Sequence, residues 1–323
     1  MGLSVKRSAI ISLESRMELD KKGVGVNLQG KRLSELLKEL KKGKNNSAEA
    51  EKIENNNDGK ISLEEMRSFN KKYCSEISWQ AVNSMKPPYD MSQDGPNKSK
   101  AVKIYENYEP GLFEKIFKFL EERKKEKLLK NIGEAEKKDK ALSSNYEILH
   151  ELSENIINGN LDAYFQVIDE MRPFDRLLKY GSEIEIGTND PSSMEVEFKA
   201  NSEDVIPKSR FEKEMLKDDS EIEITYYEVV EEYVCSSILL IAKNIMNVIP
   251  VNKVVVHAVD NVLDIDKGIK DNITILSIVF DRETLSRLNM NSINSVDAID
   301  YFICNMRHQK TSGFKSVERI TQY

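Results

Sequence analysis

Residues 54–65 have the residue types and the spacing of a calcium-binding loop. In an EF-hand loop, oxygen donors stand at positions 1, 3, 5, 9 and 12, position 7 binds through its carbonyl, and position 6 is glycine because the chain turns sharply there. Position 6 here is Gly59, and the ligand positions hold Glu54, Asn56, Asp58, Lys60, Ser62 and Glu65. The sequence therefore predicts a calcium site that Glu65 closes as a bidentate carboxylate from the first turn of the next helix.

The affinity of this site is expected to be low. Position 1 holds Glu54 in place of the usual aspartate, and its additional methylene displaces the first carboxylate. The alternative is a plain turn between two helices, because asparagine, aspartate and glycine are common in turns for backbone reasons alone. Residues 90–95 imitate the start of a second loop, but Pro96 follows and Ala101 takes the twelfth place, so they predict only a turn.

An aspartate and a Glu-x-Lys tripeptide form a second candidate site. In magnesium-dependent nucleases of the restriction-enzyme type, an aspartate at one strand end and a Glu-x-Lys on the next strand bind the metal and position the attacking water. Here Asp190 stands in a predicted turn, and Glu197 and Lys199 lie on the strand that follows. The alternative is a half-exposed strand whose polar residues share the solvent face. We favour the exposed strand and expect no cleavage of nucleic acid.

The three histidines and the known catalytic motifs give no stronger signal. His257 follows the apolar residues 254–256, which indicates a hydrogen-bonded histidine in a core strand or at a sheet edge, with a general base as the alternative. His150 and His308 have no motif around them. The sequence contains no Gly-x-Ser-x-Gly, P-loop, dinucleotide fingerprint or His-Glu-x-x-His.

The periodicity of apolar residues predicts the elements that would position these groups. The expected divisions are a small β-hairpin module at 1–30, a charged helix with the EF-hand-like unit at 31–75, an irregular proline-containing connector at 76–110, and a helical plus α+β domain at 111–323. In that last region we predict helices within 113–180, at 226–248 and at 296–306, and strands at 184–187, 194–198, 253–259 and 273–280. The fold class is therefore α+β, with a mixed or antiparallel sheet.

Composition restricts the environment and the partners. The chain has 323 residues and a net charge of −7, with 48 basic and 55 acidic residues interspersed, so nucleic acid is not indicated. Cys74, Cys235 and Cys304 show no paired spacing, which favours a reducing compartment. No apolar stretch follows Lys6 and Arg7, and charges interrupt the apolar run 229–248. We expect a soluble, cytoplasmic protein whose partner is a protein and not a membrane.

Several segments together resemble a known bacterial family. The segments MGL at 1–3, KRS at 6–8 and KGVGV at 22–26 resemble a degenerate copy of the N-terminal module catalogued as domain of unknown function number 4236. The segments DAYFQVIDEM at 162–171, DPSSMEVEF at 190–198, DRETL at 281–285 and KTSGF at 310–314 resemble the C-terminal region that often accompanies it. The resemblance implies a bacterial or phage-borne intracellular protein without a known reaction, in which the EF-hand-like loop is an addition. We therefore expect a binding or scaffold protein, with the nuclease as the alternative.

Overall fold

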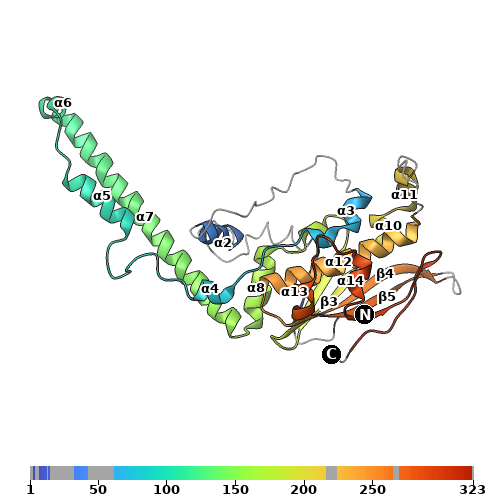
Figure 1. The fold of residues 1–323 in the computed structure, drawn as a ribbon. Coiled ribbons are helices and arrows are strands. Elements are labelled where there is room, and N and C mark those ends of the chain that lie inside the picture. Colours follow the sequence, from blue (N-terminus) through green and yellow to red (C-terminus); the bar gives the residue numbers. More distant parts are fainter. Residues whose placement is uncertain are drawn as a thin grey trace. The chain divides into compact units, whose positions relative to one another are not determined.

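The computed structural model describes residues 3, 7–12, 14, 33–42, 62–215, 224–264 and 269–321. The chain divides into two compact units (Figure 1). The first, which we call the sheet unit, contains residues 1–26, 41–77 and 159–323. The second, the hairpin unit, contains residues 27–40 and 78–158. The predicted hairpin strands within 17–28, and Glu54, Asn56, Asp58 and Lys60, lie outside the described residues.

The sheet unit is built on a six-stranded mixed sheet with its strands in chain order. The strands are β1 (Arg7–Ile11), β2 (Glu183–Thr188), β3 (Ser193–Lys199), β4 (Lys253–Asp264), β5 (Ile269–Asp281) and β6 (Ile303–Met306). Only β3 and β4 run parallel, and the other neighbouring pairs are antiparallel. The predicted α+β fold with a mixed sheet is therefore confirmed, and four of its strands lie where the sequence predicts them.

The two faces of the sheet differ because the strands alternate apolar and polar residues. On β3, Met194, Val196 and Phe198 are fully buried. The Phe198 ring meets the Tyr233 ring of α12 (Tyr226–Val248) with centroids 6.4 Å apart, so this face carries the core. The alternate residues Glu195, Glu197 and Lys199 consequently lie on the opposite face.

The core helix α12 is the long buried helix that the sequence predicts. Its N-cap is Thr225, whose hydroxyl accepts a hydrogen bond from the Glu228 backbone N–H. The helix contacts β4 and several short elements. These elements are α3 (Leu63–Arg67), η1 (Phe69–Lys71), α8 (Leu161–Met171), α14 (Ser295–Ile299) and β8 (Gly313–Phe314). The remaining elements are α9 (Asp175–Leu178), α10 (Ser202–Val205), α11 (Lys208–Met215), α13 (Arg282–Arg287) and β7 (His308–Gln309). Among the helices that the structure describes, none combines the length and the hydrophobicity of a transmembrane segment.

The hairpin unit consists of helices that run against the long helix α7 (Lys118–Ile157). They are α4 (Trp79–Asn83), α5 (Pro96–Glu106) and α6 (Leu112–Ile116). Residues 33–40 of α2 (Leu33–Lys42) also belong to this unit and include three buried leucines. Asp139 connects α7 to the start of α5, because its carboxylate accepts hydrogen bonds from the backbone N–H groups of Asn97 and Lys98 at 3.2 and 2.7 Å.

Three segments differ from the sequence prediction. The expected irregular connector at 76–110 contains α4 and α5, because Pro96 stands at the first position of a helix, where its missing N–H is harmless. The expected helix at 296–306 ends at Ile299, and Ile303–Met306 pairs with β5 as strand β6. Arg7–Ile11, placed in a separate N-terminal module, is an edge strand of the main sheet and pairs with β2.

Candidate functional site

Ser62 and Glu65 are the two predicted calcium ligands that lie within the described residues. Ser62 is the N-cap of α3, and its Oγ accepts a hydrogen bond from the Glu65 backbone N–H at 3.1 Å. Glu65 therefore stands in the first turn of the helix, as the loop pattern requires of its twelfth residue. The same Ser-x-x-Glu spacing also favours a helix start without an ion, so this geometry is compatible with both explanations.

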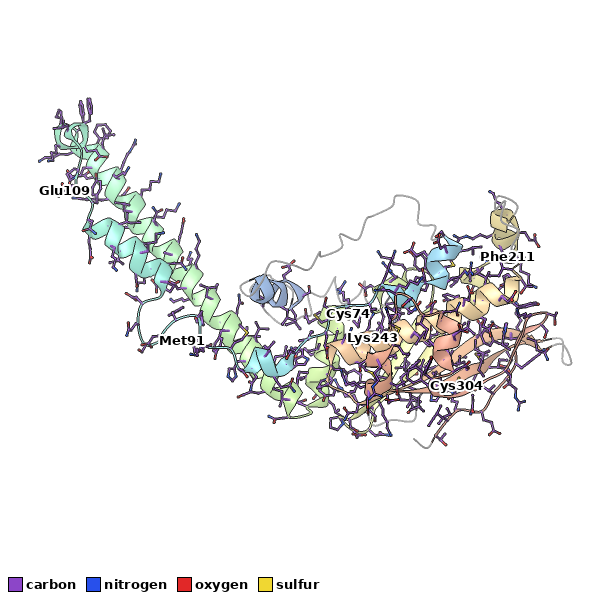
Figure 2. The ribbon with its side chains drawn as sticks, viewed as in Figure 1. Cys74, Met91, Glu109, Phe211, Lys243 and Cys304 are labelled. Atoms are coloured by element: carbon purple, nitrogen blue, oxygen red, sulfur yellow. The ribbon has the colours of Figure 1, made fainter. Side chains whose placement is uncertain are left out.

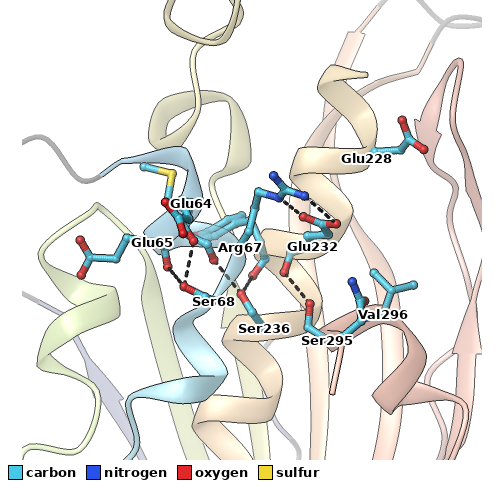
Figure 3. A network of polar contacts seen from close by, with 12 residues as sticks. Glu64, Glu65, Arg67, Ser68, Glu228, Glu232, Ser236, Ser295 and Val296 are labelled. Atoms are coloured by element: carbon cyan, nitrogen blue, oxygen red, sulfur yellow. Dashed lines mark hydrogen bonds and ion pairs between the residues drawn. The ribbon is translucent and has the colours of Figure 1, made fainter. Parts of the chain in front are cut away.

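Helix α3 is held on the core helix α12 by polar contacts (Figure 3) and by buried apolar side chains. The Arg67 guanidinium forms a two-pronged ion pair with Glu232 of α12. Ser236, one turn further along α12, donates from its Oγ to the Met66 carbonyl at 2.8 Å. Leu63 and the Met66 side chain are buried beneath the helix. The exit side of the predicted loop is therefore anchored on the core of the sheet unit.

The Glu65 carboxylate faces a lysine. Its Oε1 lies 3.5 Å from Lys72 Nζ, and both side chains are about one-third to two-fifths exposed, at 33% and 43%. An ion pair at this exposure contributes at most about 1 kcal/mol to stability. The carboxylate is therefore neither buried nor strongly held, and it is free to exchange this partner for a cation.

Asp190, the first residue of the predicted nuclease set, organises the turn between β2 and β3. Its carboxylate accepts from the Ser192 backbone N–H at 2.7 Å and from Ser193 Oγ at 2.9 Å. Hydrogen bonds from the hydroxyl and the backbone of Ser192 lower the pKa of Asp190. These bonds give the side chain a structural role in the turn.

Glu197 and Lys199 lie together on the polar sheet face, each with a partner of opposite charge. Glu197 is buried, and its Oε2 lies 2.6 Å from Nη2 of Arg319. Lys199 Nζ donates to Glu183 Oε2 at 2.7 Å, and this bond raises the pKa of the lysine. A depression of about 230 Å³ opens beside them, lined by Ile10, Glu183, Ile184, Glu185, Glu197, Lys199 and Asn272.

The structure does not bring Asp190 to Glu197 and Lys199. Asp190 precedes the first residue of β3, and Glu197 is the fifth residue of that strand, so the strand rise alone separates them by roughly 13 Å. Among the described residues no group of three or more histidine, cysteine, aspartate or glutamate side chains could hold a metal ion. Lys199, kept charged by Glu183, also lacks the free amine that a general base needs.

His257 belongs to a buried polar network on the same sheet face, as predicted for a core histidine. Its Nδ1 lies 2.9 Å from Ser277 Oγ, and its Nε2 lies 3.1 Å from Glu195 Oε1. The Ile320 backbone N–H donates to Ser277 Oγ at 2.9 Å. The network is satisfied when the hydroxyl donates to Nδ1 and Nε2–H donates to the carboxylate. A serine and a histidine, the pair that serine hydrolases use, are therefore in contact, but Ser277 is fully buried.

Sequence reasoning missed two residues that make contacts on this face, Arg319 and Ser277. Arg319 donates from its Nε to Thr274 Oγ1 at 3.1 Å and reaches Glu197 across the sheet. Ser277 meets the histidine from the neighbouring strand, at the position paired with His257 in the β4–β5 ladder. Neither residue belongs to a local motif, because both contacts depend on chain pairing over long sequence separations.

Comparison with known proteins adds no assignment: no family model, no curated protein and no solved structure matches the chain.

Proposed function

We propose that the chain is a binding or scaffold protein that binds calcium weakly through residues 54–65. The observation that carries the proposal is the start of α3. Ser62, the ninth residue of the loop, is the N-cap of the helix, and Glu65 stands in its first turn with a partly exposed carboxylate that is paired with Lys72. This is the position from which a bidentate glutamate closes an EF-hand loop.

The anchoring of α3 supports calcium binding at this loop. Ordering a ligand-bearing segment costs free energy, and a segment that is fixed beforehand lowers that cost. Here the Arg67–Glu232 pair and the Ser236 bond to Met66 fix the helix that carries Glu65. A site that binds in the folded state stabilises that state by mass action, by about 1.4 kcal/mol at ten times the dissociation constant.

Thermal unfolding of the full chain with and without calcium tests the proposal. We expect millimolar calcium to raise the melting temperature by about 3 °C, and magnesium to raise it less. Glu65→Gln should abolish the calcium-dependent shift. Glu64→Gln is the matched control, because Glu64 is the exposed neighbour in the same helix turn and should leave the shift intact. Equal shifts in the two variants would refute the site.

The polar sheet face does not favour the nuclease alternative or a hydrolase. The groups that a nuclease or hydrolase would use are occupied: Glu197 pairs with Arg319, Lys199 pairs with Glu183, and Ser277 is buried. The protein partner, the cytoplasmic location and the kinship with the bacterial module stay predictions from the sequence.

A further inference from the structure

Five large apolar side chains project from the end of the hairpin unit, around α6 and the start of α7. We call them the tip cluster: Leu112, Phe113, Ile116, Phe117 and Phe119, with exposed fractions of 81, 76, 71, 49 and 55%. Figure 2 shows the side chains at this end of the hairpin, near Glu109. Isolated exposed apolar residues are common on protein surfaces, but five within eight residues form a contiguous patch that indicates an interaction site.

Hydrogen bonds and the backbone conformation around α6 keep the tip cluster exposed. Gly111 is the N-cap of α6. The Glu114 carboxylate accepts one hydrogen bond from the Gly111 backbone N–H at 2.9 Å and another from the Tyr108 hydroxyl at 2.9 Å. The backbone leaves helical geometry at Phe117, with φ −112° and ψ 88°, before α7 begins. The Phe117 and Phe119 rings then meet edge to face with centroids 6.2 Å apart. The exposed side chains therefore belong to a capped turn.

Basic residues lie directly behind the tip cluster. Residues 96–130 contain ten lysines and arginines against six glutamates, a net charge of +4, in a chain whose total is −7. The rest of the hairpin unit within 78–158 has four lysines against eight acidic residues, a net charge of −4. Within the described residues Lys115 and Lys118 form no ion pair, whereas Glu114 is used in the cap. The segment 96–130, which carries the tip cluster, is therefore basic, and the rest of the hairpin unit within 78–158 is acidic.

We propose that the tip cluster inserts into the surface of a membrane that contains anionic lipids. Phenylalanine, leucine and isoleucine side chains enter the boundary between headgroups and acyl chains, while lysines beside them extend to the lipid phosphates. Anionic lipid attracts the basic residues of the segment 96–130, and each cation near the surface strengthens membrane binding by about fivefold. This contact requires no membrane-spanning helix and does not rest on calcium binding, and it replaces the expectation from the sequence that a membrane is not a partner.

The shape of the tip favours lipid over an apolar groove in a protein. A protein groove that binds a helix contacts apolar side chains that lie along one continuous face of that helix. Here α6 has five residues and ends at Ile116, and the backbone of Phe117 is not helical, so Leu112 and Phe119 lie on different sides of a break. An apolar cluster around the end of two antiparallel helices, with cations behind it, instead fits a flat surface that is apolar inside and negatively charged outside.

Co-sedimentation of the full chain with vesicles tests the proposal. The vesicles are phosphatidylcholine alone, or phosphatidylcholine with about one-third phosphatidylserine. We expect binding to the anionic vesicles and a several-fold loss when the ionic strength rises from about 0.1 to 0.5 M. The paired substitutions Phe113→Ser and Phe117→Ser should weaken binding at least about tenfold. Lys115→Glu with Lys118→Glu should weaken binding to anionic vesicles only.

Leu142→Ser is the matched control. Leu142 is an exposed apolar residue of the same helix, 44% exposed, and it lies about 36 Å along α7 from Lys118. This variant should bind as the unaltered chain does, and circular dichroism should show equal helix content in all variants. Absence of vesicle binding would overturn the proposal. So would self-association that the Phe113 and Phe117 substitutions abolish, because the tip cluster would then face a second copy.

Discussion

Arg319 reaches across the polar sheet face and places its Nη2 2.6 Å from Oε2 of the buried Glu197. The residues are 122 positions apart in the sequence. Ile320 reinforces the arrangement, because its backbone N–H donates to Ser277 Oγ. The C-terminal segment is therefore fixed on the face that holds Glu197 and His257.

Loss of the Arg319 guanidinium should destabilise the sheet unit. Arg319→Met leaves the buried Glu197 carboxylate without its counter-charge, which we expect to cost about 2 kcal/mol in the free energy of unfolding. Lys199→Met is the control, because its pair with Glu183 is nearly half exposed and should cost less than about 1 kcal/mol. Urea unfolding followed by circular dichroism gives both values. Equal losses would show that the Arg319 pair has no special role.

The nuclease alternative predicts cleavage that we do not expect. Asp190 is used in a turn, and Glu197 and Lys199 are neutralised by their partners. Incubation of the full chain with DNA and RNA in magnesium or manganese should leave both intact. Cleavage that disappears in Lys199→Ala would establish the alternative.

Gly95 should tolerate no side chain, for a reason that lies in α7. A Cβ at Gly95 would overlap the carboxylate of Asp139, whereas a Cβ at Gly111 has its nearest heavy atom 3.7 Å away. Both glycines are helix N-caps with nearly the same φ and ψ. We therefore expect Gly95→Ala to cost about 1–3 kcal/mol and Gly111→Ala less than about 0.5 kcal/mol, measured by urea unfolding. A similar cost at both positions would mean that the Asp139 contact is unimportant.

The Asp139 carboxylate should make the hairpin unit sensitive to acid. Burial raises its pKa, but hydrogen bonds from the Lys98 backbone and from Asn97 outweigh this effect and lower the pKa below its ordinary value of 3.8. Because the folded chain favours the charged form, the stabilisation is present at neutral pH and is lost as the pH falls through the lowered pKa.

Asp139→Asn isolates this effect from other carboxylates. At pH 7 the variant should unfold at lower urea concentration than the unaltered chain, by about 1 kcal/mol, because it loses a charged helix cap. The difference should shrink steadily below the ordinary pKa. A difference that stays constant from pH 7 to acid would assign the stability loss to packing and not to charge.

Apolar periodicity was sufficient to predict most of the sheet unit and was misleading where a proline or a short element intervened. The strands β2 to β5 and the helix α12 contain recurring apolar residues, and the sequence predicts each of them near its observed place. Pro96 favours a connector when the sequence is taken alone, but a proline at the first helical position is compatible with a helix, and the Asp139 carboxylate caps that helix by accepting from Asn97 and Lys98. Residues 303–306 continue the spacing of α14, yet pairing with β5 makes them a strand, because tertiary contacts override local pattern.

The sites were predictable only where the residues are close in the sequence. Ser62 and Glu65 lie on one helix start, so their relation follows from local spacing. Asp190 and Glu197 are also close in sequence, but an extended strand carries them apart. The Arg319–Glu197 and Ser277–His257 contacts arise from strand order and from the path of the C-terminal segment, which no local motif encodes.

Removal of the Lys72 charge should strengthen calcium binding. Its ammonium group lies 3.5 Å from the Glu65 carboxylate, so it competes with and repels a cation bound there. Lys72→Met should lower the calcium dissociation constant by about threefold. Lys71→Met, at the neighbouring exposed lysine, is the control and should change it little. An unchanged affinity in Lys72→Met would place the ion away from Glu65.

Calcium titration calorimetry of the full chain, repeated with Glu65→Gln, tests the proposed calcium site most directly. We expect one site with a micromolar to millimolar dissociation constant, since a lone loop lacks the partner that stiffens paired ones. Glu65→Gln should remove the heat of binding, while Glu64→Gln keeps it. No heat at millimolar calcium, or the same heat from Glu65→Gln as from the unaltered chain, would show that residues 54–65 are a turn and not a calcium site.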